Sequence, residues 1–227
     1  KVKGVYQGVV FPFREGFSSG ILRLNWGSDG SMFVGMTSRG WGSTGRAEYG
    51  LQRMVWNGKT AFEMKTVQAK PDGFEIEFTQ PVDEQSARDV ASYQISSFTY
   101  KYHHNYGSPV INQGTCPIKA IAVSSDRLKV RLVVDSLRLG YIHEIKAEGL
   151  LSAERNTLLH DFGFYTLNQL PDGDKLAITA ENKVNVAATA PQHNMQHETA
   201  KAPAKASKSA DLKHLTKQPA AWAKGAD

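Results

Sequence analysis

Two short runs, GFEIEFTQ at residues 73–80 and KVRLVVDS at residues 129–136, decide the fold of this chain. In each run apolar residues alternate with charged or polar residues. Successive side chains of a β-strand point to opposite faces, so this alternation gives one apolar face and one solvated face. Strands of this kind are typical of antiparallel sheets that pack one face against a core. The two runs therefore predict an antiparallel β-sandwich.

Further strand candidates surround these two runs between residues 72 and 168. They read SYQISSFTYKY, IKAIAVSS, YIHEIKAEG and FGFYTLN. Their spacing is short, and the connections carry Gly, Pro, Asp, Asn or Ser, which mark turns. The segment DEQSARDVASY, residues 83–93, is the only plausible helical turn. We expect an immunoglobulin-like or fibronectin-like β-sandwich over residues 71–170.

The chain before residue 70 predicts a second, smaller sheet. Four short β-like runs, VYQGVVFPF, ILRLNW, SMFVGMT and LQRMVW, are separated by turn signals. Four strands joined as a meander within about fifty residues match one blade of a β-propeller. A single blade cannot bury both faces, so we expect residues 1–70 to form a propeller-blade-like sheet whose other blades are missing. The alternative is a small sheet packed against the following domain.

The last part of the chain, residues 171–227, is rich in Ala, Lys and Pro. It cannot bury enough apolar surface to offset the entropy of ordering a domain. We expect an extended or disordered tail. If the tail is ordered on another surface, Leu212, Leu215 and Trp222 are its expected anchors.

Composition narrows the function classes. The net charge is +5, and the basic residues are spread along the chain without a cluster that could follow a phosphate backbone. We therefore do not expect the chain to bind nucleic acid. The single cysteine, Cys116, excludes an internal disulfide, and no CxxC or CxxCH motif is available for zinc or c-type haem. No apolar run approaches a membrane span. The chain starts KVKGVYQG without an initiator Met or a signal peptide, so we expect a processed product or a piece of something longer.

Taken together, the segment from YQGVVFPF to LQRMVW resembles the final propeller segment of bacterial secreted glucose/sorbosone dehydrogenase-like proteins. The following DGFEIEFTQPVDEQSARDVASYQISSFTYKYHHNYGSP and LLHDFGFYTLNQLP resemble the sandwich appended to that propeller, and many such proteins also carry a c-type cytochrome domain. The resemblance implies a periplasmic or secreted protein. It implies pyrroloquinoline quinone (PQQ), calcium or haem c only in missing or partner segments. No catalytic residue of that family matches a position in this chain.

The glycine-rich stretch MTSRGWGSTGRAEYG, residues 36–50, is a first candidate site. Arg39 and Arg46 offer planar donor forks for carboxylate, sulfate or phosphate, and Trp41 and Tyr49 offer stacking surfaces. The alternative is a rigid connector whose glycines permit positive φ, with Trp41 packed on a neighbouring blade and the arginines paired with nearby acids.

The stretch FTYKYHHNYGSP, residues 98–109, is a second candidate. Its site residues are Tyr100, Tyr102, His103, His104 and Tyr106. In a strand, Tyr100 and Tyr102 share one face, and this density of aromatic and imidazole rings suits carbohydrate stacking or protein docking. Adjacent histidines on a strand point to opposite faces, so they do not readily share one metal. The alternative is that the tyrosines pack across the domain interface while the histidines are solvated.

In the tail, HNMQH places His193, Met195 and His197 as a weak candidate copper site. No nucleophile elbow, catalytic triad or phosphate-binding loop is present. We therefore expect a non-catalytic structural and interaction module of a secreted or periplasmic dehydrogenase-like assembly. Its partners would be the remaining blades, other protein subunits or a c-type cytochrome. The alternatives are a component of a quinone-dependent sugar dehydrogenase and, third, a carbohydrate-binding module.

Overall fold

The structure is a computed structural model that describes residues 1–41 and 45–184. The chain divides into two compact units. Of the described residues, one unit combines Lys1–Arg14 with residues 60–184, and the other comprises Glu15–Lys59. Each unit is described by itself below. Within the described residues no helix is both long enough and apolar enough to cross a membrane.

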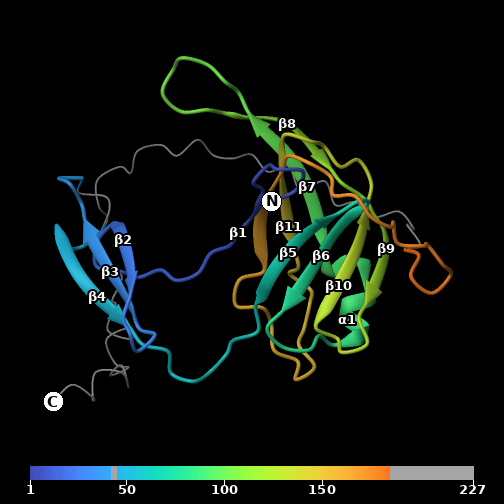
Figure 1. Ribbon diagram of the computed structural model, residues 1–227, viewed down its shortest axis with the longest axis horizontal. Helices are drawn as coiled ribbons and strands as arrows, with labels where there is room; N and C mark the ends of the chain where they lie inside the picture. Colours follow the sequence, from blue (N-terminus) through green and yellow to red (C-terminus); the bar gives the residue numbers. More distant parts are fainter. Residues whose placement is uncertain (42–44, 185–227) are drawn as a thin grey trace, which may run out of the picture. The chain divides into compact units, whose positions relative to one another are not determined.

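The larger unit is a β-sandwich of two antiparallel sheets (Figure 1). The five-stranded sheet has the order β1 (Gly8–Val10), β12 (Phe162–Leu167), β11 (Tyr141–Lys146), β7 (Gln94–Tyr100), β8 (Val110–Thr115). The four-stranded sheet has the order β5 (Met64–Lys70), β6 (Gly73–Phe78), β10 (Lys129–Val134), β9 (Ile118–Val123). The all-β fold and the sandwich predicted from the alternating runs are confirmed.

The core of the sandwich follows the alternation that is visible in the sequence. In β6 the side chains of Phe74, Ile76 and Phe78 are buried, while the glutamates between them remain accessible. Val130 and Leu132 of β10 are buried in the same way, and β10 pairs with β6 along its whole length. The alternation therefore predicts these strands correctly, because one face of the sheet is buried in the core and the other faces solvent.

The predicted helical turn is present as α1 (Glu84–Arg88) followed by the 3-10 turn η1 (Val90–Ser92). Asp83 caps α1 by accepting a hydrogen bond from the Ser86 amide at 2.9 Å. This bond to the charged carboxylate lowers the pKa of Asp83, as does the nearby Arg155. Asp83 thus has a structural role as the N-cap of α1.

The smaller unit contains three strands, whereas the sequence predicts four. Its antiparallel sheet has the order β2 (Ile21–Trp26), β3 (Met32–Thr37), β4 (Tyr49–Met54). The run expected to be the first strand of this sheet instead supplies β1, which pairs with β12 in the sandwich. Val9 packs there against the sandwich core, and the side-chain Nε2 of Gln7 donates to the Gln169 carbonyl at 3.0 Å. Strand alternation alone does not say which sheet edge a strand joins. In the structure β1 pairs with the edge of β12.

The division of the chain also differs from the expected boundaries at residues 70 and 170. The hairpin β5–β6 places the start of the sandwich before residue 70. At the other end, the described part of the expected tail contacts the sandwich. The Ile121 amide of β9 donates to the Asn182 carbonyl at 2.8 Å, and the Leu176 amide donates to Asp72 at 2.8 Å. These bonds hold residues 176–182 on the four-stranded sheet.

Candidate functional site

The three-stranded sheet of the smaller unit is the main candidate site because it buries few of its apolar side chains. Its buried cluster consists of Met32, Val34 and Met36, which lie on one face of β3, with Phe17 and Met54 packed against them. Three buried residues form a much smaller core than that of the sandwich. A sheet of two or three strands needs a packed apolar face for stability.

The β2 half of this same face is open. Trp26 lies opposite Met32, and Leu24 lies opposite Val34, so both side chains continue the buried row of β3 onto β2. Leu24 is nevertheless 57% exposed and Trp26 is 68% exposed. All six residues of β2 are exposed. An exposed apolar row that continues a buried one marks a surface that another element can cover.

The β4 half of the face is covered by the segment that precedes β2. The Ser18 amide donates to the side chain of Gln52 at 3.0 Å, and the Ser18 carbonyl accepts bonds from the amides of Arg46 and Ala47, both at 2.9 Å. Met36 lies under this crossing, with its sulfur 3.6 Å from the Ser18 hydroxyl. The crossing segment explains why β3 is dry while β2 is not.

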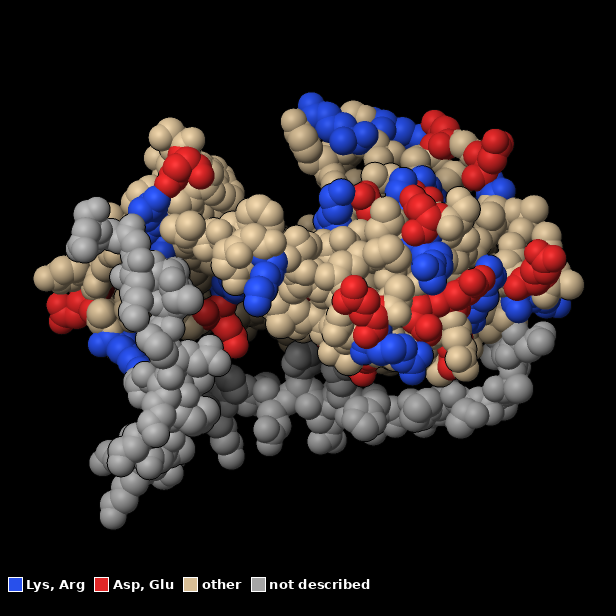
Figure 2. Space-filling view, turned by 90° about the horizontal axis from the view of Figure 1, so that it is seen from below, with Lys and Arg blue, Asp and Glu red and all other residues tan. Residues whose placement is uncertain are grey.

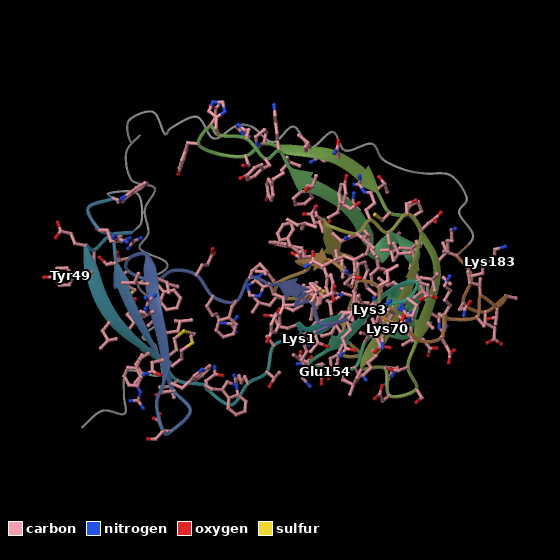
Figure 3. All side chains as sticks on the ribbon, turned by 45° about the horizontal axis from the view of Figure 1, so that its top comes forward. Lys1, Lys3, Tyr49, Lys70, Glu154 and Lys183 are labelled. Carbon is pink, nitrogen blue, oxygen red and sulfur yellow. The ribbon has the colours of Figure 1, made fainter. Side chains whose placement is uncertain are left out.

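The opposite face of the sheet is mixed in character. Tyr49 and Leu51 of β4 are 76% and 71% exposed, and Figure 3 shows Tyr49 projecting away from the sheet. Arg53 on the same face pairs with Asp29 in the β2–β3 turn. The pKa of Asp29 is lowered to about 2, first by the hydrogen bond from the Ser31 hydroxyl and then by the Ser31 amide and Arg53. This turn is held by local polar contacts.

The structure places the predicted stretch around Arg39 and Tyr49 as the connection between β3 and β4. Arg39 and Gly40 have φ values of 51° and 84°, and the Trp41 amide donates to the Ser38 carbonyl at 2.9 Å. At Gly45, a Cβ would lie 2.5 Å from the Ser18 carbonyl oxygen. Gly40 is thus required by its positive φ, and Gly45 by the close approach of the Ser18 backbone. These contacts support the rigid-connector interpretation for the ends of the stretch. The ion pairs which that interpretation expected for Arg39 and Arg46 do not occur within residues 1–41 and 45–184.

The Tyr/His stretch forms the connection between β7 and β8, which projects beyond the sandwich (Figure 1). Strand β7 ends at Tyr100, so Tyr102 lies in the loop and does not share a strand face with Tyr100. Tyr102 and Tyr106 are fully exposed, and His104 is exposed as well. His103 is half-buried, and its Nε2 is buried without a hydrogen-bond partner. The loop therefore presents two free phenol rings rather than a closed pocket.

Sequence reasoning missed a row of aromatic rings on the outer face of the five-stranded sheet. Phe162, Phe164, Phe98 and Tyr100 follow one another with ring centroids 5.7, 6.3 and 5.6 Å apart, each pair edge to face. Their positions alternate with the buried residues Tyr165 and Ile95. The signal was present in FGFYTL and SSFTY as aromatic residues two positions apart, but alternation alone does not say which face of the sheet packs against the core.

Titratable groups of the sandwich are engaged in structural contacts. His143 is fully buried, and its Nε2 accepts from the Arg138 amide at 3.3 Å. Burial lowers the pKa of His143 to about 4. Cys116 is buried 3.2 Å from the Ser97 hydroxyl, and burial raises the pKa of its thiol. His160 contacts Glu63 at 2.8 Å.

Across the described ranges, no three His, Cys, Asp or Glu side chains come together as a metal site. His193, Met195 and His197 lie outside the described residues, as do the predicted tail anchors Leu212, Leu215 and Trp222. The charged residues on the face of the sandwich in Figure 2 mix both signs, with Lys and Arg beside Asp and Glu. Ion pairs between neighbouring strands of the four-stranded sheet include Lys65–Glu77 and Lys70–Glu75.

Comparison with known proteins gives little similarity. No protein-family profile matches the chain, and no curated protein sequence matches it. Among solved structures, two of the surface-layer protein SbsC align with it, one of domains 1–6 and one of the fragment rSbsC(31-844). Each alignment has 20% identity and a TM-score of 0.37, and covers 48% of this chain and 14% of the other. The chain thus spans a small fraction of the length of the proteins it aligns with.

Proposed function

We propose that this chain is a non-catalytic structural and interaction module whose small sheet docks onto another polypeptide. The observation that carries the proposal is the open apolar half of the three-stranded sheet. Leu24 and Trp26 extend a buried row of side chains, yet more than half of each side chain faces solvent. Monomeric soluble proteins rarely leave contiguous apolar surface of this kind uncovered.

The resemblance noted in the sequence gives the proposal a finer form. The small sheet would be part of one propeller blade, and the sandwich would be an immunoglobulin-like domain appended to it. The complete assembly would be a secreted or periplasmic dehydrogenase-like protein, associated with a c-type cytochrome. PQQ, calcium or haem would then be held by the other blades or subunits, and we assign no chemical step in this chain to them.

The experiment that tests docking uses the protein isolated from its natural source. Its intact native mass is measured, and cross-linking with mass spectrometry locates the contacts with any partner. We expect a mass well above 25.0 kDa, the mass of this chain, with cross-links concentrated at Lys59 and the neighbouring strands of the small sheet. A native particle of 25.0 kDa without cross-links to another polypeptide would contradict the proposal.

A matched pair of variants separates docking from general surface effects. Leu24→Ser places a polar side chain on the open face and should weaken the association. Leu159→Ser changes a similarly exposed leucine of the sandwich and should leave it intact. Truncation of a side chain at the desolvated centre of an interface can cost more than about 1 kcal/mol of binding free energy, whereas truncation at the rim costs little. Equal effects of the two variants would argue against the small sheet as the docking surface.

A second candidate function, carbohydrate binding, is favoured by the fully exposed rings of Tyr102 and Tyr106. Exposed phenol rings on a projecting loop offer flat apolar faces together with a polar hydroxyl. An oligosaccharide array should then show binding that Tyr102→Ala and Tyr106→Ala both reduce. Binding that survives the double variant, or no binding at all, would remove this candidate.

A further inference from the structure

We propose that the free edge of β2 takes up an extended strand from the partner polypeptide and so converts the three-stranded sheet into a four-stranded one. This inference rests on the proposed docking function and specifies its chemistry. The small sheet would be completed by backbone hydrogen bonds as well as by contact between side chains. Addition of a strand to an exposed sheet edge is a common mode of peptide recognition.

The register of β2 shows which backbone groups are available. The Gly27 amide donates to the Ser31 carbonyl at 2.7 Å, next to the opposed pair Trp26 and Met32. In antiparallel pairs, hydrogen-bonded and non-bonded positions alternate along the strand. Asn25 therefore bonds to β3, whereas Leu24 and Trp26 direct their backbone N–H and C=O groups away from it.

These outward groups are weakly occupied. The Trp26 amide is held by the side chain of its neighbour Asn25 at 2.9 Å, and the Leu22 carbonyl accepts from the Arg23 guanidinium at 3.1 Å. Both partners are exposed side chains on β2 itself that can swing aside. The backbone groups of Leu24 that face outward have no partner within the described part of the chain.

Beside Leu24 and Trp26, the edge of β2 carries little of what usually protects an edge strand. Natural edges carry proline, inward-pointing lysine or a bulge, or are covered by another segment. Strand β2 has neither proline nor lysine, and its one irregularity lies between Ile21 and Arg23, away from Leu24 and Trp26. The combination of four exposed large apolar side chains with an unprotected edge indicates a strand that is paired when the protein works.

The two faces of the sheet define the partner strand. On one face it would lie beside Leu24 and Trp26, so its residues there should be apolar. On the other face it would lie beside Arg23, which forms no ion pair within residues 1–41 and 45–184. Opposite charges directly across two strands stabilise their pairing. We infer a segment that alternates apolar residues with acidic ones.

The test uses a synthetic probe peptide, acetyl-Thr-Val-Glu-Val-Glu-Val-Thr-amide, titrated into the isotope-labelled full chain and followed by amide NMR shifts. Shifts should concentrate on β2, above all on the Leu24 and Trp26 amides. The same peptide N-methylated at its valines, which cannot pair, should bind at least about tenfold more weakly. A peptide with lysine in place of glutamate should also bind more weakly to wild type, and Arg23→Glu should reverse that preference.

Two proline variants provide a matched comparison in the protein. Leu24→Pro removes an outward N–H from the β2 edge, and Leu51→Pro does the same at β4. Leu51 also occupies a position that does not bond to β3. The Ser38 amide bonds to the Glu48 carbonyl at 2.6 Å, and bonded and non-bonded pairs alternate along β4 from there, so Leu51 falls on a non-bonded pair. Proline is tolerated at such edge positions. Leu24→Pro should lose binding of the probe about tenfold or more, while Leu51→Pro should keep it.

Several results would overturn the inference or the proposed function on which it rests. Shifts that avoid β2, or equal binding by the N-methylated peptide, would exclude strand addition without any variant. Concentration-dependent self-association that Leu24→Pro abolishes would assign the edge to a second copy of the chain. If the native assembly persists in Leu24→Pro, docking stands but proceeds through another surface. If wild type forms no assembly at all, the proposed function itself fails.

Discussion

Gly73 shows how closely the sandwich strands approach each other at single residues. It begins β6 directly opposite Val133 of β10, and a Cβ at this position would collide with the Leu132 carbonyl oxygen. That oxygen belongs to the backbone of the four-stranded sheet and cannot move without disturbing the hydrogen bonds between its strands. Glycine is therefore required here for space rather than for turn geometry.

Gly73→Ala should consequently lower the free energy of unfolding of the sandwich by about 3 kcal/mol. Gly8→Ala is the control, since a Cβ at Gly8 meets no atom within 4 Å. It should change stability by less than about 0.5 kcal/mol. Chemical denaturation with fluorescence detection measures both, and equal losses would contradict the close approach at Gly73.

His143 makes the sandwich sensitive to acid. Its pKa is about 4 in the folded protein, against an ordinary value of 6.5, because burial disfavours the charged imidazolium. Between these two pH values the unfolded chain therefore binds more protons than the folded chain. The contribution of His143 to the free energy of unfolding is fully present above pH 6.5 and is lost as the pH drops toward 4. The shift corresponds to about 3 kcal/mol at the lower end of this window.

Replacing His143 with phenylalanine should flatten the dependence of unfolding free energy on pH between about 6.5 and 5. Carboxylates with lowered pKa, such as Asp83, lose their contribution at lower pH and do not obscure this window. Urea titrations at half-unit steps of pH provide the slope. An unchanged slope in the variant would show that another group is responsible.

At the scale of elements, a nearly buried ion pair ties the chain after β12 to the four-stranded sheet. Arg131 of β10 pairs with Asp72, and the side chains are only 12% and 11% exposed. The second oxygen of Asp72 accepts from the Leu176 amide. One carboxylate thus joins the β5–β6 turn, strand β10 and the segment that returns along the sheet.

Asp72→Ala should cost about 3 kcal/mol of stability because it leaves the Arg131 guanidinium buried and unpaired. Hydrogen exchange at the Leu176 amide should accelerate in the same variant. Lys119→Ala, which breaks an exposed pair with Asp135, is the control and should cost less than about 1 kcal/mol. Slow exchange at Leu176 in Asp72→Ala would contradict the assigned tie.

The elements that the sequence predicts well are those in which one face is dry. Phe74, Ile76 and Phe78 alternate with acidic residues, so β6 could be assigned from the pattern of the sequence alone. The placement of β1 could not, because its partner β12 lies more than 150 residues later and any open edge satisfies the same pattern. For the same reason ILRLNW indicates a strand but not that Leu24 and Trp26 stay uncovered. Exposure depends on where the segment around Ser18 crosses the sheet.

For the whole molecule, the division into two units predicts independent folding of the sandwich. Its strands, including β1, bury their apolar faces against each other without help from Glu15–Lys59. Replacing those residues with a flexible Gly/Ser linker should change the unfolding free energy of the sandwich by about 1 kcal/mol or less. Circular dichroism and denaturant titration measure this, and loss of the cooperative transition would contradict the division.

The most direct measurement of the docking account is hydrogen exchange of β2 in the free chain and in the native assembly. In the free chain the Leu24 amide, which has no acceptor among residues 1–41 and 45–184, should exchange rapidly, together with the amide of Trp26. In the assembly both amides should become protected, while those of the sandwich core stay unchanged. Equally rapid exchange of β2 in both states would contradict the claim that this sheet is completed by a partner.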